Sequence, residues 1–129
     1  GLETSLGKNI YIGIGELSDD ARKIGLSDDL LRAKVELQLR KHGLKIVEYV
    51  NHNGYFLVSV QVRNNVFSID VDYHRRVSYS VGIEAFGMWG EVWENGGFGE
   101  HGGSADYIIE TVLKYVDIFA AEYLRVNGL

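Results

Sequence analysis

Several ordinary constituents are missing from this chain of 129 residues. The absence of cysteine excludes disulfides, thiolate metal sites and a cysteine nucleophile. Proline is also absent, so we expect the turns to be made with glycine and asparagine. No apolar run approaches the roughly 18 residues of a transmembrane helix, and no signal peptide is recognisable. We therefore expect one domain, residues 1–129, with a single core and no membrane span.

Positive charge is missing from a long stretch of the chain. The net charge is −5, and no Lys or Arg occurs between Val77 and Leu113. Nucleic-acid binding is disfavoured, because phosphate contacts need clustered cations. Two interpretations stay open: ordinary solvated surfaces, or an acidic surface that meets a cationic partner or a second copy. The acidic residues of this stretch are Glu84, Glu91, Glu94, Glu100, Asp106 and Glu110.

The strongest periodic signal lies near the C-terminus, between Ser104 and Asn127. Its apolar residues recur every three or four positions, which predicts a long helix with one buried side. Ser104 is a good N-cap, and Asn127-Gly128 supplies a stop. The predicted core residues are Ile108, Ile109, Val112, Leu113, Val116, Phe119, Ala120, Tyr123 and Leu124.

The first half of the chain predicts one strand and two helices. Isoleucine alternates with other residues from Asn9 to Leu17, as in a strand with one buried face. Ser18 and Ser27 each precede two aspartates and fit N-cap positions. We expect a helix of one or two turns ending at Gly25, and a longer one from Ser27 to about His42. The longer helix has a second apolar stripe, Leu30, Ala33 and Leu37, which we expect to meet the C-terminal helix or a partner.

Two hairpins are predicted in the middle of the chain. Asn53-Gly54 is typical of a tight turn joining a strand at Leu44–Val50 to one at Tyr55–Arg63. A turn at Asn64-Asn65 gives a register in which every pair on one face is apolar. That register pairs Val62 with Phe67, Val60 with Ile69, Val58 with Val71 and Phe56 with Tyr73.

The second strand of this hairpin is long, and the same parity continues to Val81. We expect a bend near His74-Arg75-Arg76 and a final strand near Phe86–Glu94. The predicted fold class is α+β: a two-layer sandwich of order β-α-β-β-β(-β)-α. Its sheet is mainly antiparallel, both helices cover one face, and the other face is left open.

The chain resembles a set of small uncharacterised bacterial proteins, many of which carry signal peptides. The resemblance rests on residues 35–44, 67–71, 76–78, 93–99 and 123–127. It implies a periplasmic or exported location, and it carries over no functional residue. The predicted architecture also resembles the amino-terminal domain of TolB and similar envelope lipoproteins, which is similarity of fold alone. The chain starts at Gly1 rather than Met, so we expect that it has been trimmed.

A candidate metal site lies on one predicted strand. Asp70, Asp72 and His74 alternate along the same face, although Asp is disfavoured in strands. Two carboxylates and an imidazole suit a divalent ion. Neighbouring side chains on one strand face stand about 6.5–7 Å apart, which makes chelation by all three awkward. The alternative is a solvated sheet face whose charges discourage aggregation.

A glycine pattern precedes the last helix. Residues 97–102 match G-x-G-x-x-G, but no later strand could complete a dinucleotide-binding unit. A small anion could be held at the helix N-terminus by Gly97, Gly99, Gly102 and Ser104. The alternative is a turn-rich connector without a ligand.

Aromatic side chains gather in the same acidic region. Either they belong to the core of an edge strand, or they form an exposed patch that binds a partner or a saccharide. The residues of this candidate patch are Phe86, Met88, Trp89, Trp93 and Phe98.

Function is not specified by any catalytic pattern. The four histidines are scattered, no serine context suggests a triad, and we identify no catalytic residue and expect no cofactor. The leading hypothesis is a non-enzymatic interaction module of the bacterial cell envelope that binds a protein or its own copy. The alternatives are a metal-dependent, hydrolase-like site on the open face and the small-anion site.

Overall fold

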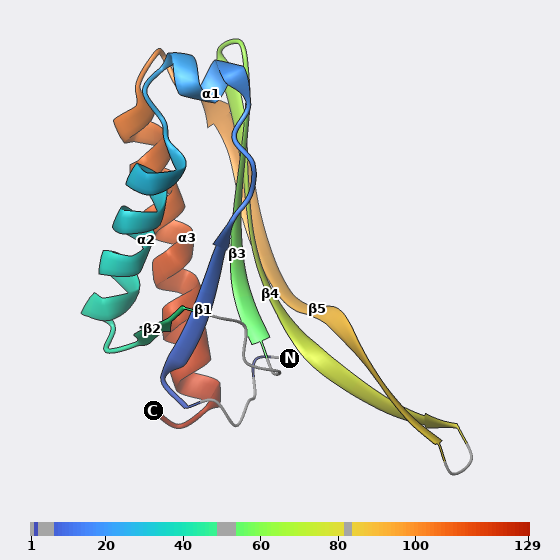
Figure 1. The fold of residues 1–129 in the computed structure, drawn as a ribbon. Helices are drawn as coiled ribbons and strands as arrows, with labels where there is room; N and C mark the ends of the chain where they lie inside the picture. The colour runs from blue at the N-terminus through green and yellow to red at the C-terminus, as the bar shows by residue number, and fades with distance from the viewer. Residues whose placement is uncertain (1, 3–6, 49–53, 82–83) are drawn as a thin grey trace.

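The computed structural model describes the backbone of residues 2, 7–48, 54–81 and 84–129, and side chains there except at 76–90 and 92. It confirms an α+β fold in two layers, with helices packed on a sheet (Figure 1). In chain order the elements are β1 (Asn9–Ile14), α1 (Asp19–Lys23), α2 (Asp28–Lys41), β2 (Lys45–Val47), β3 (Gly54–Arg63), β4 (Val66–Val81), β5 (Glu84–Glu100) and α3 (Ala105–Val126). The sheet order is β2-β1-β3-β4-β5.

The predicted helix boundaries are confirmed. The hydroxyls of Ser18, Ser27 and Ser104 accept hydrogen bonds from backbone amides three residues later, at 3.3, 3.1 and 3.1 Å. Each bond satisfies a donor that the first turn of a helix leaves free. After the helices, Gly25 and Gly43 adopt φ values of 98° and 83°, which stop α1 and α2 at little steric cost.

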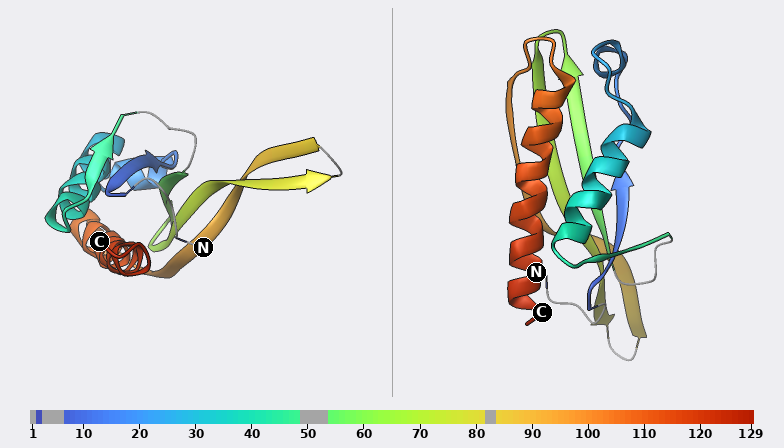
Figure 2. Two further views of the ribbon diagram at one scale, coloured as in Figure 1. Left: turned by 90° about the horizontal axis from the view of Figure 1, so that it is seen from below. Right: turned by 90° about the vertical axis from the view of Figure 1, so that its left-hand side faces the viewer.

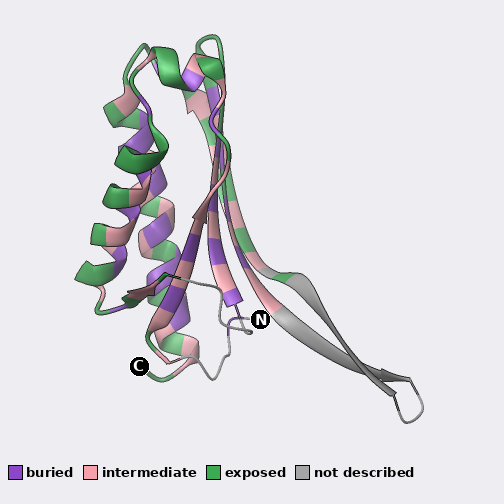
Figure 3. Cartoon of the chain, viewed as in Figure 1, coloured by how far each residue is buried: buried purple, intermediate pink, exposed green. Residues whose placement is uncertain are grey.

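The core lies between the helices and one face of the sheet (Figure 3). Phe119 of α3 is at its centre, with its ring centroid 4.1 Å from that of Phe56 and 5.5 Å from that of Tyr73. Most of the predicted α3 residues are buried, while Leu113 and Leu124 are half-buried at the rim. From α2 the core receives Leu31, Val35 and Leu39.

The second apolar stripe of α2 is only partly covered. Leu30 borders a groove between the two long helices, where it faces Ile109 and Leu113 of α3. Ala33 and Leu37 are exposed, and Leu37 keeps half of its surface in solvent. The prediction that this stripe meets the C-terminal helix therefore holds for Leu30 alone.

The β3–β4 hairpin has the predicted register, from Arg63 opposite Val66 to Tyr55 opposite His74. Asn64 makes the turn with a φ of 52°, a conformation that asparagine tolerates better than most residues. Its amide donates to the carboxylate of Asp20 in α1 at 2.7 Å, which ties the turn to the first helix.

The predicted hairpin between β2 and β3 is wrong. β1 lies between these strands and pairs with both in parallel. Close approach explains part of this order, since Gly13 of β1 and Gly15, just after β1, lie against Leu57 and Ser59 of β3. A Cβ atom added at Gly13 would lie 3.3 Å from Leu57 Cδ1, and one added at Gly15 would lie 3.0 Å from Ser59 Oγ. Asn53 of the expected turn lies outside the described residues.

The last strand is longer than the predicted Phe86–Glu94, because β5 runs from Glu84 to Glu100 and pairs with the whole of β4. Residues 97–100 therefore belong to a strand and not to a connector. The predicted bend is confirmed as a β-bulge at Tyr73/His74. β3 begins at Gly54, opposite Arg75, so beyond this point β4 and β5 continue as a two-stranded ribbon away from the body (Figures 1 and 2).

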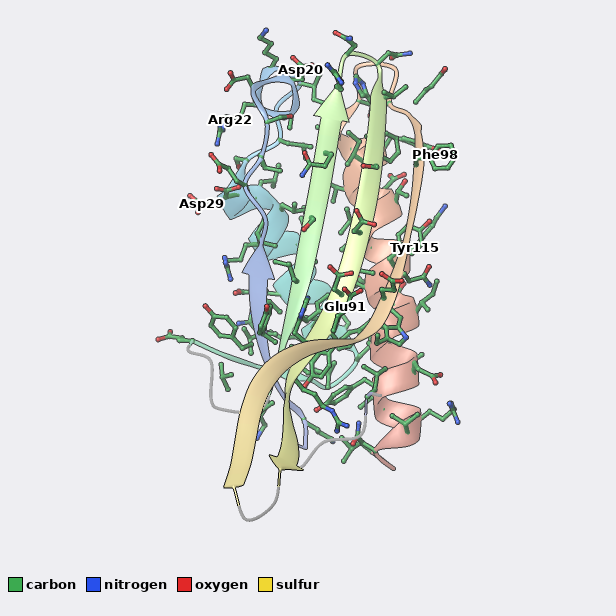
Figure 4. The ribbon with its side chains drawn as sticks, turned by 90° about the vertical axis from the view of Figure 1, so that its right-hand side faces the viewer. Asp20, Arg22, Asp29, Glu91, Phe98 and Tyr115 are labelled. Carbon is green, nitrogen blue, oxygen red and sulfur yellow. The ribbon has the colours of Figure 1, made fainter. Side chains whose placement is uncertain are left out.

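Both long helices cover the same face of the sheet (Figure 2). The opposite face of β3, β4 and β5 is uncovered in the described part of the chain, as predicted (Figure 4). None of the helices among the described residues combines the length and hydropathy needed to cross a bilayer.

Candidate functional site on the uncovered sheet face

The uncovered face is built from rows of side chains that cross three strands. Alternation along β3 and β4 turns one set of residues toward the helices and the next set outward. The two registers then define which outward residues are neighbours. From the ribbon end to the hairpin end, the rows are Tyr55–His74–Glu91, Leu57–Asp72–Glu94, Ser59–Asp70–Gly96 and Gln61–Ser68–Phe98.

The first row depends on the bulge. Tyr73 is opposite Trp93, but the next residue, His74, is opposite Glu91. Val92 is the extra residue of β5 and has no partner in the register. Bulges commonly re-aim a side chain in this way, and here a carboxylate is placed across from an imidazole.

Asp72, His74 and Glu91 form a compact cluster. One ligand atom from each lies within 4.8 Å of the others, and His74 Nε2 is 4.0 Å from Asp72 Oδ2. The His74 ring stacks on Tyr55 with centroids 4.8 Å apart and planes 6° apart. Its Nε2 atom is buried and makes no hydrogen bond in the described structure. The imidazole is thus held in place with one nitrogen directed at carboxylates.

The electrostatics of the cluster disfavour full ionisation. Burial raises the pKa of Asp72; His74 and a hydrogen bond with Glu91 oppose the shift, and repulsion from Asp70 and Glu94 adds to it. The pKa of Glu94 is also raised, first by a hydrogen bond with Glu91 and then by repulsion from it. The carboxyl groups of Asp72 and Glu94 therefore hold their protons more tightly than isolated carboxyl groups do.

The predicted metal set is brought together only in part. Asp72 and His74 are neighbours, whereas Asp70 is exposed and lies opposite Ser59 and Gly96. Among the described residues, the compact group contains Glu91 in place of Asp70. Sequence reasoning missed Glu91 as a member of this cluster, because its position across from His74 requires knowledge of the bulge. Its place in an acidic, lysine-free stretch was the available signal.

A second feature lies near the hairpin end of the same face. Phe98 is 91% exposed and Val66 is 51% exposed. Together with neighbours on β3 and β4 they line a shallow hollow of about 340 Å³. Figure 4 shows the Phe98 ring projecting from β5. The lining residues are Gln61, Arg63, Val66, Phe67, Ser68 and Phe98.

The predicted aromatic patch is divided between the two faces. Trp93 is half-buried, and its ring centroid lies 5.4 Å from that of Phe119 in the core. Phe98 points to the uncovered side. The side chains of Phe86, Met88 and Trp89 lie outside the described residues. Trp93 therefore packs against the core, as in the first interpretation, and Phe98 is exposed, as in the second.

The predicted anion-binding residues do not share one loop. Gly97 and Gly99 are in β5, where added side chains would meet Tyr115 and Phe67. Gly102 lies in the turn before α3 with a φ of 59°, and the Ser104 hydroxyl caps α3. His101 is buried beside this turn: its Nδ1 accepts from the Gly103 amide at 2.8 Å, and its Nε2 is 2.6 Å from the Asn64 carbonyl oxygen.

No protein-family model matches this chain, and no curated protein matches its sequence. The resemblance to small bacterial proteins and to TolB-like envelope domains therefore stays a prediction.

Proposed function

We propose that this protein is a non-enzymatic binding module whose uncovered sheet face receives an extended, basic segment of a partner protein. The observation that carries this proposal is the 91% exposure of Phe98 beside the hollow on that face. An exposed phenyl ring next to a concave apolar surface is typical of an anchor point in protein recognition.

The outer edge of β5 supports an extended ligand. β4 is the partner of β5 along Glu84–Glu100, and no other strand of the described chain pairs with it. Backbone donors and acceptors along this edge can pair with an added strand, and pockets beside the edge would select its side chains. Phe98 belongs to β5 and lines the hollow together with residues of β3 and β4, so a segment added at this edge could also contact its ring.

The charge of this surface indicates which kind of partner segment it would bind. On the outward side of β5, Phe98 stands between Gly96 and Glu100, and Glu94 and Glu91 follow in the next rows. The whole stretch from Val77 to Leu113 contains no Lys or Arg. Such a surface attracts a segment that carries Lys or Arg beside an apolar residue. We place the module in the bacterial cell envelope, periplasmic or exported, on the family resemblance alone.

The test uses two synthetic peptides, one of alternating lysine and valine and one of alternating glutamate and valine. We expect the basic peptide to shift the β5 amide resonances and to bind at least tenfold more weakly to Phe98→Ala. Ile118→Ala is the matched control, because Ile118 is a 47% exposed apolar residue on α3. Equal binding of the acidic peptide, or unchanged binding by Phe98→Ala, contradicts the proposal.

Light scattering separates this proposal from self-association. We expect a monomer at the concentrations of the titration. A dimer that Phe98→Ala disrupts would assign the face to a second copy of the chain and overturn the separate partner.

A further inference from the structure

The Asp72–His74–Glu91 cluster offers one imidazole nitrogen and two carboxylates within a small volume. Imidazole suits zinc and related transition metals, and carboxylates complete many such sites. We propose that these three residues bind a divalent transition-metal ion of the Zn²⁺ type on the uncovered face. The inference is independent of the partner proposal, since it concerns the ribbon end of the face and not the Phe98 hollow.

The distances between the ligand atoms are slightly longer than those of a metal-bound site and fit a site that contracts when the ion binds. Zinc–ligand bonds of about 2.0–2.2 Å place the ligand atoms of a tetrahedral site roughly 3.3 Å apart. His74 Nε2 and Asp72 Oδ2 are 4.0 Å apart, and one ligand atom from each of the three residues lies within 4.8 Å of the others. Glu91 is exposed, so its carboxylate can rotate toward the other two without displacing core residues.

His74 supplies the fixed point of the site. Its ring is stacked on Tyr55, and its side chain is only 19% exposed. The buried Nε2 atom has no hydrogen bond, although burial of such a group without a partner is unfavourable. A metal bond would satisfy this nitrogen, and the stacked ring loses little freedom when the ion binds.

The carboxylates supply the second argument. Asp72 and Glu91 lie close to Glu94 and Asp70, so like charges are crowded on one face. A divalent ion between Asp72 and Glu91 converts this repulsion into attraction. Glu94 is opposite Asp72 and interacts with both Asp72 and Glu91, so it stands next to the ligand set, where it or a water can complete the coordination. Three protein ligands leave such a position open.

Calorimetric titration of the full chain with Zn²⁺ tests the site. We expect saturable binding of one ion, and at least a tenfold loss of affinity in His74→Ala and in Glu91→Gln. Cobalt should give the visible absorption of a site of low coordination number. Ca²⁺ and Mg²⁺ should bind much more weakly, because these ions prefer oxygen ligands.

Two control variants make the test specific. Asp70→Asn removes a carboxylate from the same strand face but outside the cluster, and we expect less than a threefold change. His42→Ala removes an imidazole at the C-terminal cap of α2, 2.8 Å from Asp117, and should have no effect. Circular dichroism confirms folding of each variant. Absence of saturable Zn²⁺ binding, or an equal loss in Asp70→Asn or His42→Ala, overturns the proposal.

Discussion

Glu91 lies directly across from His74, although regular pairing from Tyr73 and Trp93 would have placed Val92 there. A single extra residue in β5 therefore decides which chemical group faces the imidazole. The same irregularity lies where β3 begins and where β4 and β5 continue as a two-stranded ribbon. The bulge thus affects both the shape of the sheet and which side chains meet on its uncovered face.

Phe119→Ala should be the most damaging of the single substitutions proposed for this protein. The ring is fully buried and lies near the rings of Phe56, Tyr73, Trp93 and Tyr123. Its removal leaves a large cavity, and the expected loss in the free energy of unfolding is about 3–5 kcal/mol. Urea denaturation measures this loss. Ile118→Ala, at the preceding and exposed position of α3, should change stability by less than about 1 kcal/mol; a similar loss in both variants would contradict this view of the core.

Two glycines of β5 should respond differently to alanine. At Gly96, an added Cβ would collide with the backbone carbonyl oxygen of Ile69 in the neighbouring strand. At Gly99, the nearest atoms belong to the Phe67 ring, 3.4 Å away, which is ordinary contact. We expect Gly96→Ala to destabilise the protein by about 1–3 kcal/mol and Gly99→Ala to be nearly neutral. Thermal unfolding of the two variants checks this order, and the reverse order would contradict the β4–β5 register.

The sequence predicted best those features that depend on neighbours along the chain. Serine caps, glycine stops and the Asn64-Asn65 turn each involve residues that are close in the sequence. The register of the hairpin is also well determined, because a one-residue slip would turn every apolar side chain to the wrong face. The position of β1 between β2 and β3 was not accessible in this way. Asn53-Gly54 favours a local hairpin, and the competing parallel pairing joins residues that are far apart in the sequence.

The candidate site was only half predictable for the same reason. Asp72 and His74 share one strand, so their common face followed from alternation. Glu91 joins them through a bulge, which no pattern of alternating residues announces. Gly97 and Gly99 were assigned to a loop because glycine is common in turns. In the structure both are in β5, where Gly97 makes room for Tyr115 and Gly99 lies in ordinary contact with Phe67.

His101→Ala should loosen the junction between β5 and α3. The imidazole accepts from the Gly103 amide through Nδ1, so its proton is on Nε2 and is donated to the Asn64 carbonyl oxygen. Removal loses two part-buried hydrogen bonds, each worth about 0.5–1.5 kcal/mol, so the expected cost is about 1–3 kcal/mol. Urea denaturation measures the loss, and nitrogen chemical shifts identify the tautomer. Glu100→Ala, at the exposed preceding position, is the control; equal stability of His101→Ala and wild type would contradict the role of this ring.

Acid should weaken the contact between the two long helices. Asp117 of α3 accepts from Gln38 of α2 at 2.6 Å and lies 2.8 Å from His42 Nε2. Partial burial opposes ionisation of Asp117, but the hydrogen bonds from Gln38 and His42 outweigh it, and the pKa is lowered in the folded state. The contribution of Asp117 to stability is therefore complete above its unfolded pKa of about 3.9 and is lost as the pH falls through the lower folded value.

Asp117→Asn should remove this pH-dependent contribution. The side chain is 47% exposed, so we expect the variant to be less stable than wild type at pH 6 by less than about 1 kcal/mol. The difference should shrink as the pH falls below about 4, because wild type then also carries a neutral side chain. Urea denaturation at several pH values follows both proteins. Glu110→Gln on the exposed side of α3 controls for the removal of one negative charge. A gap between Asp117→Asn and wild type that stays constant down to pH 2 would show that Asp117 does not act through its ionised form.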